Sequence, residues 1–122
     1  METSGKHHIV ELWGSTFDKL NDLDFIRKTL IQAAEKAGVD IREKIFHRFT
    51  PHGLSGVLVL AESHLSIHTF PEHGYASVDI YTCGDSVNPS LAIDHICEQL
   101  AATSVEKLEI NRGEKPMRII SH

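Results

Sequence analysis

The 122-residue sequence has few cysteines, only Cys83 and Cys97, and this scarcity excludes several classes of protein. Two cysteines are too few for the disulfide framework of a small secreted domain. Without a CxxC pair, neither a zinc ribbon nor a dithiol redox site is expected. The first residues, Met1 to Lys6, lack the apolar run of a secretory signal. We therefore expect a cytoplasmic protein with both thiols reduced.

Long apolar runs and an excess of basic residues are also missing. No stretch approaches the ~20 apolar residues of a membrane span. The net charge is −5, and binding to nucleic acid or to an anionic membrane is not expected because both require clustered Lys and Arg. The charge slightly favours a cationic small molecule. The length and the apolar fraction of 41% predict one domain over residues 1–122.

Several segments have the apolar runs or the alternation of β-strands. They are residues 7–13, 41–49, 54–61, 64–68, 75–83 and 105–110. Two further segments have apolar residues at helical spacing. The first begins after Asn21 or Asp22 and ends at Gly38, a natural residue to follow a helix, and the second opens at Asn88 and Pro89.

The resulting order, β-α-β-β-β-β-α-β, predicts an α/β protein of the α+β type. Because four strands follow one another across tight turns, the sheet should be mainly antiparallel. Two helices can cover only one face of it, so we expect a two-layer sandwich. Residues 112–122 have no strong pattern, and a loose tail is expected there.

The uncovered face of this predicted sheet should be polar and aromatic. By alternation it carries Tyr75, Ser77, Asp79, Tyr81 and Cys83, with His64, Ser66 and His68 on the neighbouring strand. A solvated face explains such a composition. A dimer interface or a ligand site explains the combination of Tyr, His and Cys better.

The segment from Ala61 to Glu72 concentrates hydroxyls, imidazoles and carboxylates. No GxSxG elbow surrounds its serines, which argues against a serine hydrolase. His64 and His68 lie about 13 Å apart on a strand, too far to share one metal ion. We expect no metal centre, and a metal-dependent hydrolase using His47, His64 or His68 is the weakest alternative. Composition alone leaves an active site and an ordinary polar strand equally open.

The longer run AESHLSIHTFPEHGYASVDIYTCG, from Ala61 to Gly84, is more specific. It resembles the prokaryotic S-adenosylmethionine decarboxylase proenzymes, and the resemblance extends from His7 to about Gly113. Further matching blocks are HHIVELWG at the start and the Phe46–Gly56 segment. The resemblance implies decarboxylation of S-adenosylmethionine for polyamine (spermidine) synthesis by a covalent pyruvoyl group.

The family cuts its own chain at a Glu-Ser bond, which corresponds here to Glu62-Ser63. The resemblance implies that the Ser63 hydroxyl attacks the Glu62 carbonyl carbon, so that the amide becomes an ester. Elimination of the Glu62 carboxylate then leaves dehydroalanine, which hydrolyses to pyruvoyl and ammonia. The products would be a β chain of residues 1–62 and an α chain of residues 63–122.

The resemblance also assigns processing residues. His68 would be the base, and Ser55 would assist it. Alternation adds a condition, because Ser63 and His68 fall on opposite faces of a regular strand. We therefore expect a turn or bulge between these two residues.

Cys83 matches the family's proton donor. The pyruvoyl carbonyl would form a Schiff base with the substrate and act as the electron sink when CO2 leaves. A thiol with an ordinary pKa near 8.5 is mostly protonated at neutral pH and can return the proton. Packing as a small apolar side chain is the alternative for a cysteine, and it suits Cys97 better.

Substrate-binding residues follow from the same resemblance. Phe49 and Phe70 would flank the adenine, and Glu72 would contact the ribose. Relatives often have Trp at the position of Phe70. Aromatic faces suit both a sulfonium cation and an adenine, although core packing is the more common role for a phenylalanine.

The family implies a homodimer of αβ units or a higher oligomer. Two other functions stay open at the level of the sequence. The same self-processing fold could decarboxylate another amino acid such as arginine, since the cleavage motif does not distinguish the substrates. A non-catalytic small-molecule binding domain would keep an intact chain.

Overall fold

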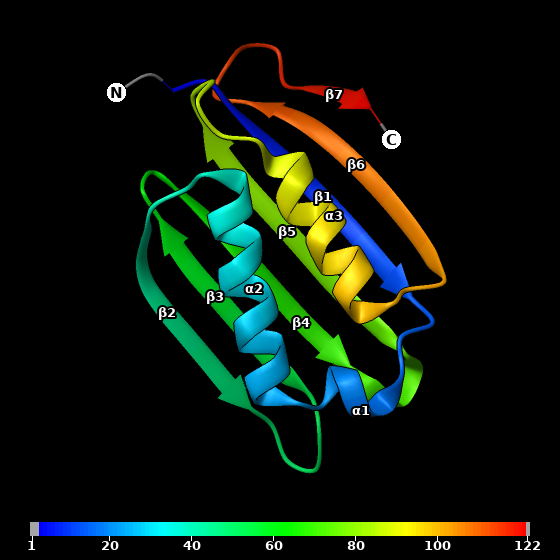
Figure 1. The fold of residues 1–122 in the computed structure, drawn as a ribbon. Coiled ribbons are helices and arrows are strands. Elements are labelled where there is room, and N and C mark those ends of the chain that lie inside the picture. Colours follow the sequence, from blue (N-terminus) through cyan, green and yellow to red (C-terminus); the bar gives the residue numbers. More distant parts are fainter. Residues whose placement is uncertain (1–2, 122) are drawn as a thin grey trace.

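The computed structural model describes residues 3–121 and contains one antiparallel sheet with helices on one side (Figure 1). The elements in chain order are β1 (Gly5–Trp13), α1 (Phe17–Leu20), α2 (Leu23–Ala37), β2 (Ile41–Arg48), β3 (Leu54–Leu60), β4 (Ser63–Phe70), the 3-10 helix η1 (Pro71–His73), β5 (Tyr75–Cys83), α3 (Pro89–Leu100), β6 (Ser104–Arg112) and β7 (Arg118–Ser121). The strand order is β2-β3-β4-β5-β1-β6-β7, and every neighbouring pair is antiparallel.

The predicted order of six strands and two long helices is confirmed, and three elements are added to it. The short helix α1 precedes α2, the 3-10 helix η1 separates β4 from β5, and β7 forms in the segment expected to be a loose tail. That expectation was wrong because β7 gains its order from pairing with β6, as in the Ile110–Ile119 register. Its own four residues are too few to show a strand pattern and are all exposed.

The ends of α2 follow local rules. Asp22 is the N-cap, and its Oδ1 accepts a hydrogen bond from the Phe25 N–H at 3.1 Å. Gly38 ends the helix with φ at 79°, a left-handed conformation that glycine adopts without steric cost. None of the helices within residues 3–121 is long and apolar enough to span a membrane.

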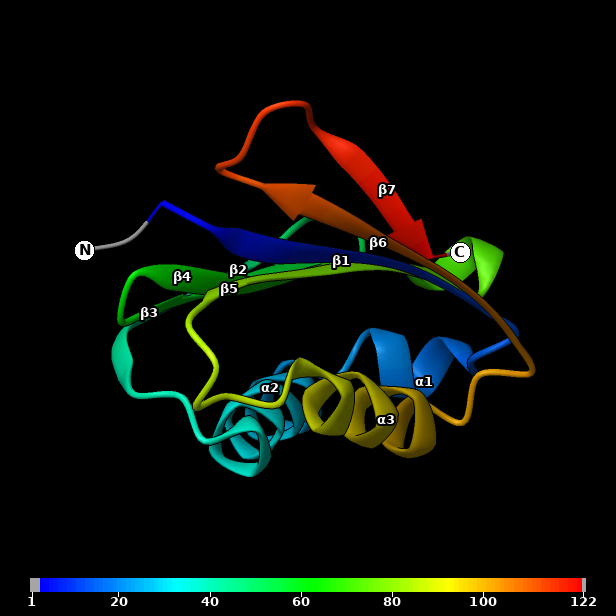
Figure 2. The same ribbon diagram turned by 90° about the horizontal axis from the view of Figure 1, so that it is seen from above.

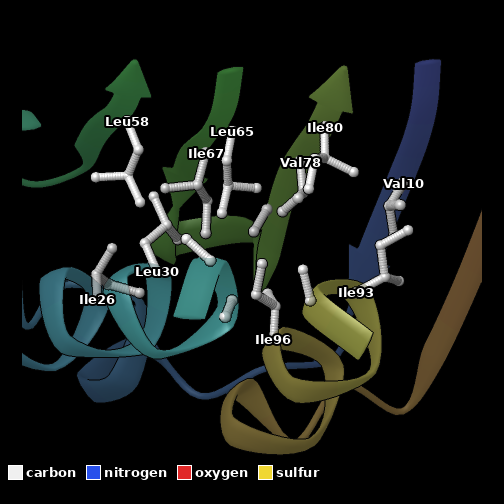
Figure 3. Close-up of a cluster of buried hydrophobic side chains, with 14 of the residues drawn as sticks. Val10, Ile26, Leu30, Leu58, Leu65, Ile67, Val78, Ile80, Ile93 and Ile96 are labelled. Carbon is white, nitrogen blue, oxygen red and sulfur yellow. The ribbon is translucent and has the colours of Figure 1, made fainter. Parts of the chain in front are cut away.

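The core lies between the sheet and the helices α2 and α3, which cover the same face (Figure 2). Ile26 and Leu30 of α2 and Ile96 of α3 point at the strands (Figure 3). Alanines such as Ala33, which is fully buried, let helices and sheet approach closely. Each fully buried aliphatic side chain contributes about 1.5–3 kcal/mol relative to an exposed one. Among residues 3–121, this packing leaves the second face of the sheet without a covering layer, as predicted.

Candidate active site

The strand register sorts the side chains of the open face into rows that run across β4, β5 and β1. From the Ser63 end, the rows are His64, Tyr81 and His7; Ser66, Asp79 and Ile9; His68, Ser77 and Glu11; and Phe70, Tyr75 and Trp13. The face therefore carries the polar and aromatic residues expected for it. An open cavity of about 260 Å³ lies over the second and third rows.

The predicted scissile bond lies in the turn that joins β3 to β4. Glu62 has φ at 61°, in the left-handed region that a non-glycine residue rarely occupies. The Ser63 hydroxyl donates a hydrogen bond to the Ala61 carbonyl at 3.1 Å. The left-handed conformation of Glu62 therefore places backbone strain of about 1–2 kcal/mol directly before the bond that would be cut.

The bend expected between Ser63 and His68 is absent. β4 is continuous from Ser63 to Phe70, and its registers with β3 and β5 run without a shift. The irregular backbone lies one residue earlier, at Glu62, because the chain reverses there rather than within the strand. Five residues of strand span roughly 16 Å, so the His68 imidazole cannot reach Ser63 of its own chain.

Ser55 and His68 form a hydrogen-bonded pair on neighbouring strands. They are register partners across β3 and β4, and Ser55 Oγ lies 2.7 Å from His68 Nδ1. The structure thus brings these two predicted processing residues together. It places them toward the end of β4 that is distant from Ser63.

Cys83 lies at the Ser63 end of the sheet. It ends β5, is half-buried, and carries a free thiol. It follows Tyr81, the register partner of His64, by two residues, so it lies at the end of β5 that is next to the start of β4. A hydrogen bond between Tyr81 and the Cys83 side chain, together with burial, raises the pKa of the Tyr81 hydroxyl. Cys97 instead packs against the core from α3, where burial raises the pKa of its thiol.

The predicted substrate-binding residues gather at the other end. Phe49 and Phe70 are 48% and 41% exposed, which is unusual for residues that would serve only as core. Phe70 stacks on Tyr75 at 5.4 Å between ring centroids, and Tyr75 stacks on Trp13 at 4.3 Å. Glu72 lies in η1, where its carboxylate contacts the His52 imidazole.

The predicted residues therefore form two groups at opposite ends of β4. The cleavage-end group is Glu62, Ser63 and Cys83. The aromatic-end group is Ser55, His68, Phe49, Phe70 and Glu72. Neither group alone contains both the serine to be activated and the base assigned to it.

A sequence profile described as S-adenosylmethionine decarboxylase matches residues 6–113. The chain belongs to the S-adenosylmethionine decarboxylase family. The chain is also 56% identical to the S-adenosylmethionine decarboxylase proenzyme of Geobacillus kaustophilus, covering 98% of this chain and 95% of that protein. It is 57% identical to the proenzyme of Bacillus velezensis, covering 98% and 94%.

Solved structures agree with the fold of this S-adenosylmethionine decarboxylase family member. The adenosylmethionine decarboxylase of Aquifex aeolicus superposes with a TM-score of 0.86 at 39% identity, over 93% of this chain and 94% of that one. A Trypanosoma brucei AdoMetDC monomer matches with a TM-score of 0.63 at 15% identity, over 86% of this chain and 45% of that one. The second similarity concerns the fold alone.

The open face of this decarboxylase-family chain also carries a polar cluster. The sequence placed His64, Ser66 and Asp79 on this face, which it favoured as a dimer interface or a ligand site, but it did not include His7. Asp79 Oδ2 lies 2.6 Å from His7 Nε2 and 2.7 Å from His64 Nε2. Burial alone would raise the pKa of Asp79. Hydrogen bonds from Ser66, His64 and His7 outweigh that effect and hold the pKa below its ordinary value. Only the pairing of β1 with β5 brings His7 to this place, a pairing between segments distant in the sequence.

Proposed function

We propose that this chain cuts itself at Glu62-Ser63 and then decarboxylates S-adenosylmethionine with a pyruvoyl group at position 63. One observation carries the proposal: the Glu62-Ser63 bond lies in a left-handed turn at the end of the sheet where β5 ends in Cys83. The curated relatives are named proenzymes, which is consistent with self-processing. Cleavage would release the local backbone strain, since a newly formed chain end is free to leave the left-handed region.

The first step is attack of Ser63 Oγ on the Glu62 carbonyl carbon, which converts the amide to an ester. A serine hydroxyl is a weak nucleophile, so a base must take its proton. The hydroxyl now donates a hydrogen bond to the carbonyl of Ala61, the residue before Glu62, so this bond must be given up for the attack. Rotation about its Cα–Cβ bond is the movement that attack requires.

The residues present fit a pyruvoyl group at position 63. From His64 onward, β4 pairs with β3 on one side and β5 on the other, so the new chain end would be held after cleavage. When present, the group supplies a carbonyl that draws electrons from the substrate α-carbon as CO2 leaves. Cys83 lies on the adjacent strand and holds the proton to be returned to that carbon.

We propose that a second copy of the chain supplies the aromatic-end group. His68 is roughly 16 Å along the strand from Ser63 of its own chain, so the base must come from another chain. A twofold axis between two open faces would bring the cleavage-end group of one copy to the aromatic-end group of the other, twice. The exposed apolar residues Ile45 and Val59 on this face, 60% and 39% exposed, suit such a contact.

In that arrangement Phe49 and Phe70 flank the adenine, and Glu72 binds the ribose. Both rings are exposed at the end of the sheet, so they are available to stack on a flat base. The side chain of Glu72 is 38% exposed and can exchange its contact with His52 for a ribose hydroxyl. Trp13 and Tyr75 support the ring of Phe70 from behind.

Intact-mass measurement tests the cleavage. We expect two chains, residues 1–62 and 63–122, with the second lighter by one ammonia than a simple hydrolysis product. Ser63→Ala should remain a single full-length chain and show no decarboxylase activity. A full-length wild-type chain under conditions that release CO2 from S-adenosylmethionine would contradict the mechanism. CO2 release from arginine alone would contradict the substrate.

A further inference from the structure

The cluster formed by His7, His64 and Asp79 has no role in the proposed reaction. The three side chains come from β1, β4 and β5, and their ligand atoms all lie within 4.8 Å of one another. The two rings meet edge to face, with centroids 5.8 Å apart and planes at 88°. Both Nε2 atoms point at the same carboxylate oxygen, Asp79 Oδ2.

Neighbouring groups orient the cluster. Ser66 donates its hydroxyl to Asp79 Oδ1, which leaves Oδ2 directed at the histidines. The side chains of His7, Asp79 and His64 are 16%, 25% and 38% exposed, so the cluster is partly exposed and a small ion can reach it from solvent. A hydrogen bond to the second atom of a ligating group is the usual support of a metal ligand.

We propose that His7 Nε2, His64 Nε2 and Asp79 Oδ2 bind a divalent transition-metal ion, with Zn²⁺ the best match. Two imidazoles and one carboxylate are ligands that Zn²⁺ accepts, whereas Mg²⁺ and Ca²⁺ prefer oxygen alone. Tetrahedral coordination with bonds of about 2.0–2.1 Å separates ligand atoms by about 3.3 Å. The two contacts of 2.6 and 2.7 Å must therefore open by less than an ångström.

Arg112 opposes the ion. Its Nη1 lies 3.0 Å from His7 Nδ1 and donates to it, which places the ring proton on Nε2. Metal coordination at Nε2 moves that proton to Nδ1, where it can no longer accept from Arg112. The exposed guanidinium must then swing away. Removing the Arg112 guanidinium should strengthen binding of the ion for two reasons. The Nδ1 of His7 can then carry the ring proton, and a nearby positive charge is lost.

The ion would link two parts of the chain. β1 contributes His7 from residues 1–62, and β4 and β5 contribute the other ligands from residues 63–122. If the chain is cleaved as proposed above, the ion would tie the two products together next to position 63. This consequence rests on the proposed cleavage, whereas binding of the ion does not.

The test is Zn²⁺ titration of chelator-treated protein by calorimetry, cleaved or intact, with native mass spectrometry to count bound ions. We expect one ion per copy of residues 1–122, and at least tenfold weaker binding in His64→Ala and in Asp79→Asn. Arg112→Ala should bind more tightly than wild type. His47→Ala is the matched control, because His47 is an exposed histidine on β2 outside the cluster, and its affinity should not change.

Ser63→Ala should bind Zn²⁺ as the wild type does, which separates this site from any failure of cleavage. A thousandfold excess of Mg²⁺ should not displace the ion. The proposal is overturned if no stoichiometric binding occurs, if both His64→Ala and Asp79→Asn keep wild-type affinity, or if Cys83→Ala alone abolishes binding. Should His64→Ala fail to fold, Asp79→Asn and Ser66→Ala decide the question, because both keep the two imidazoles.

Discussion

At the scale of single residues, backbone conformation and hydrogen bonding distinguish groups that composition treats alike. Cys83 and Cys97 are both half-buried thiols, but Cys83 ends a strand near the start of β4, whereas Cys97 lies in α3 and packs against the core. Glu62 differs from every other glutamate among the described residues in its left-handed backbone. These differences, rather than residue type, identify the positions suited to chemistry.

Cys83→Ala separates the two reactions. Processing should continue, because the thiol takes no part in forming the ester. Decarboxylation should fall by about 100-fold or more, the range of a lost general acid. Intact mass reports the first reaction and CO2 release reports the second, with Cys97→Ala as the control that keeps both. Full turnover of Cys83→Ala would exclude it as the proton donor.

His8 should make the fold sensitive to acid. Burial lowers the pKa of its imidazole below 6.5, and contact with Glu109 only partly offsets this. Its Nδ1 has no hydrogen-bond partner among the described residues. The unfolded chain binds the proton near pH 6.5 and the folded chain only at lower pH, so stability should decrease as the pH falls below about 6.5.

Urea unfolding at pH 7.5 and pH 5.5 measures that loss. His8→Gln retains an amide able to bond Glu109 but does not titrate in this range. Its stability should therefore fall less between the two pH values than that of the wild type. Equal losses in the two proteins would mean that other groups, not His8, set the acid sensitivity.

At the scale of elements, the sequence predicted strongly patterned segments and missed those that depend on a partner. α2 combines a cap at Asp22, an apolar stripe and Gly38, so its existence and both ends were predictable. β7 was not, because residues 118–121 form a strand only against β6. A turn between β3 and β4 was predicted, but the left-handed backbone of Glu62 was missed for a similar reason. The left-handed conformation arises because Glu62 joins the antiparallel strands β3 and β4, and glutamate has no intrinsic preference for a left-handed backbone.

At the scale of the whole molecule, the site is divided between the two ends of the sheet. Alternation along β4 already showed that Ser63 and His68 face opposite ways. Only the observed continuity of the strand excluded the bend that would have reconciled them. A second copy is then the simplest source of the missing base.

Mixed oligomers test this division. A His68→Ala chain keeps Ser63, and a Ser63→Ala chain keeps His68, so neither should be cleaved alone. Co-expression with different tags should restore cleavage of the His68→Ala chain, because its partner supplies the base. The control replaces the partner by the Ser63→Ala, His68→Ala double variant, which should restore nothing. Cleavage that stays absent in the first mixture would contradict a site shared between copies.

The sequence by itself determined the fold class, the family and the positions of the candidate chemistry. Local periodicity and a long specific motif contain that information without any knowledge of contacts. Only the tertiary structure decided which of those positions meet. It paired Ser55 with His68, placed Cys83 at the end of the sheet where β4 begins, and brought His7 to His64 and Asp79. The reason is that strand order and register join segments distant in the chain, and no local pattern specifies that β1 lies between β5 and β6.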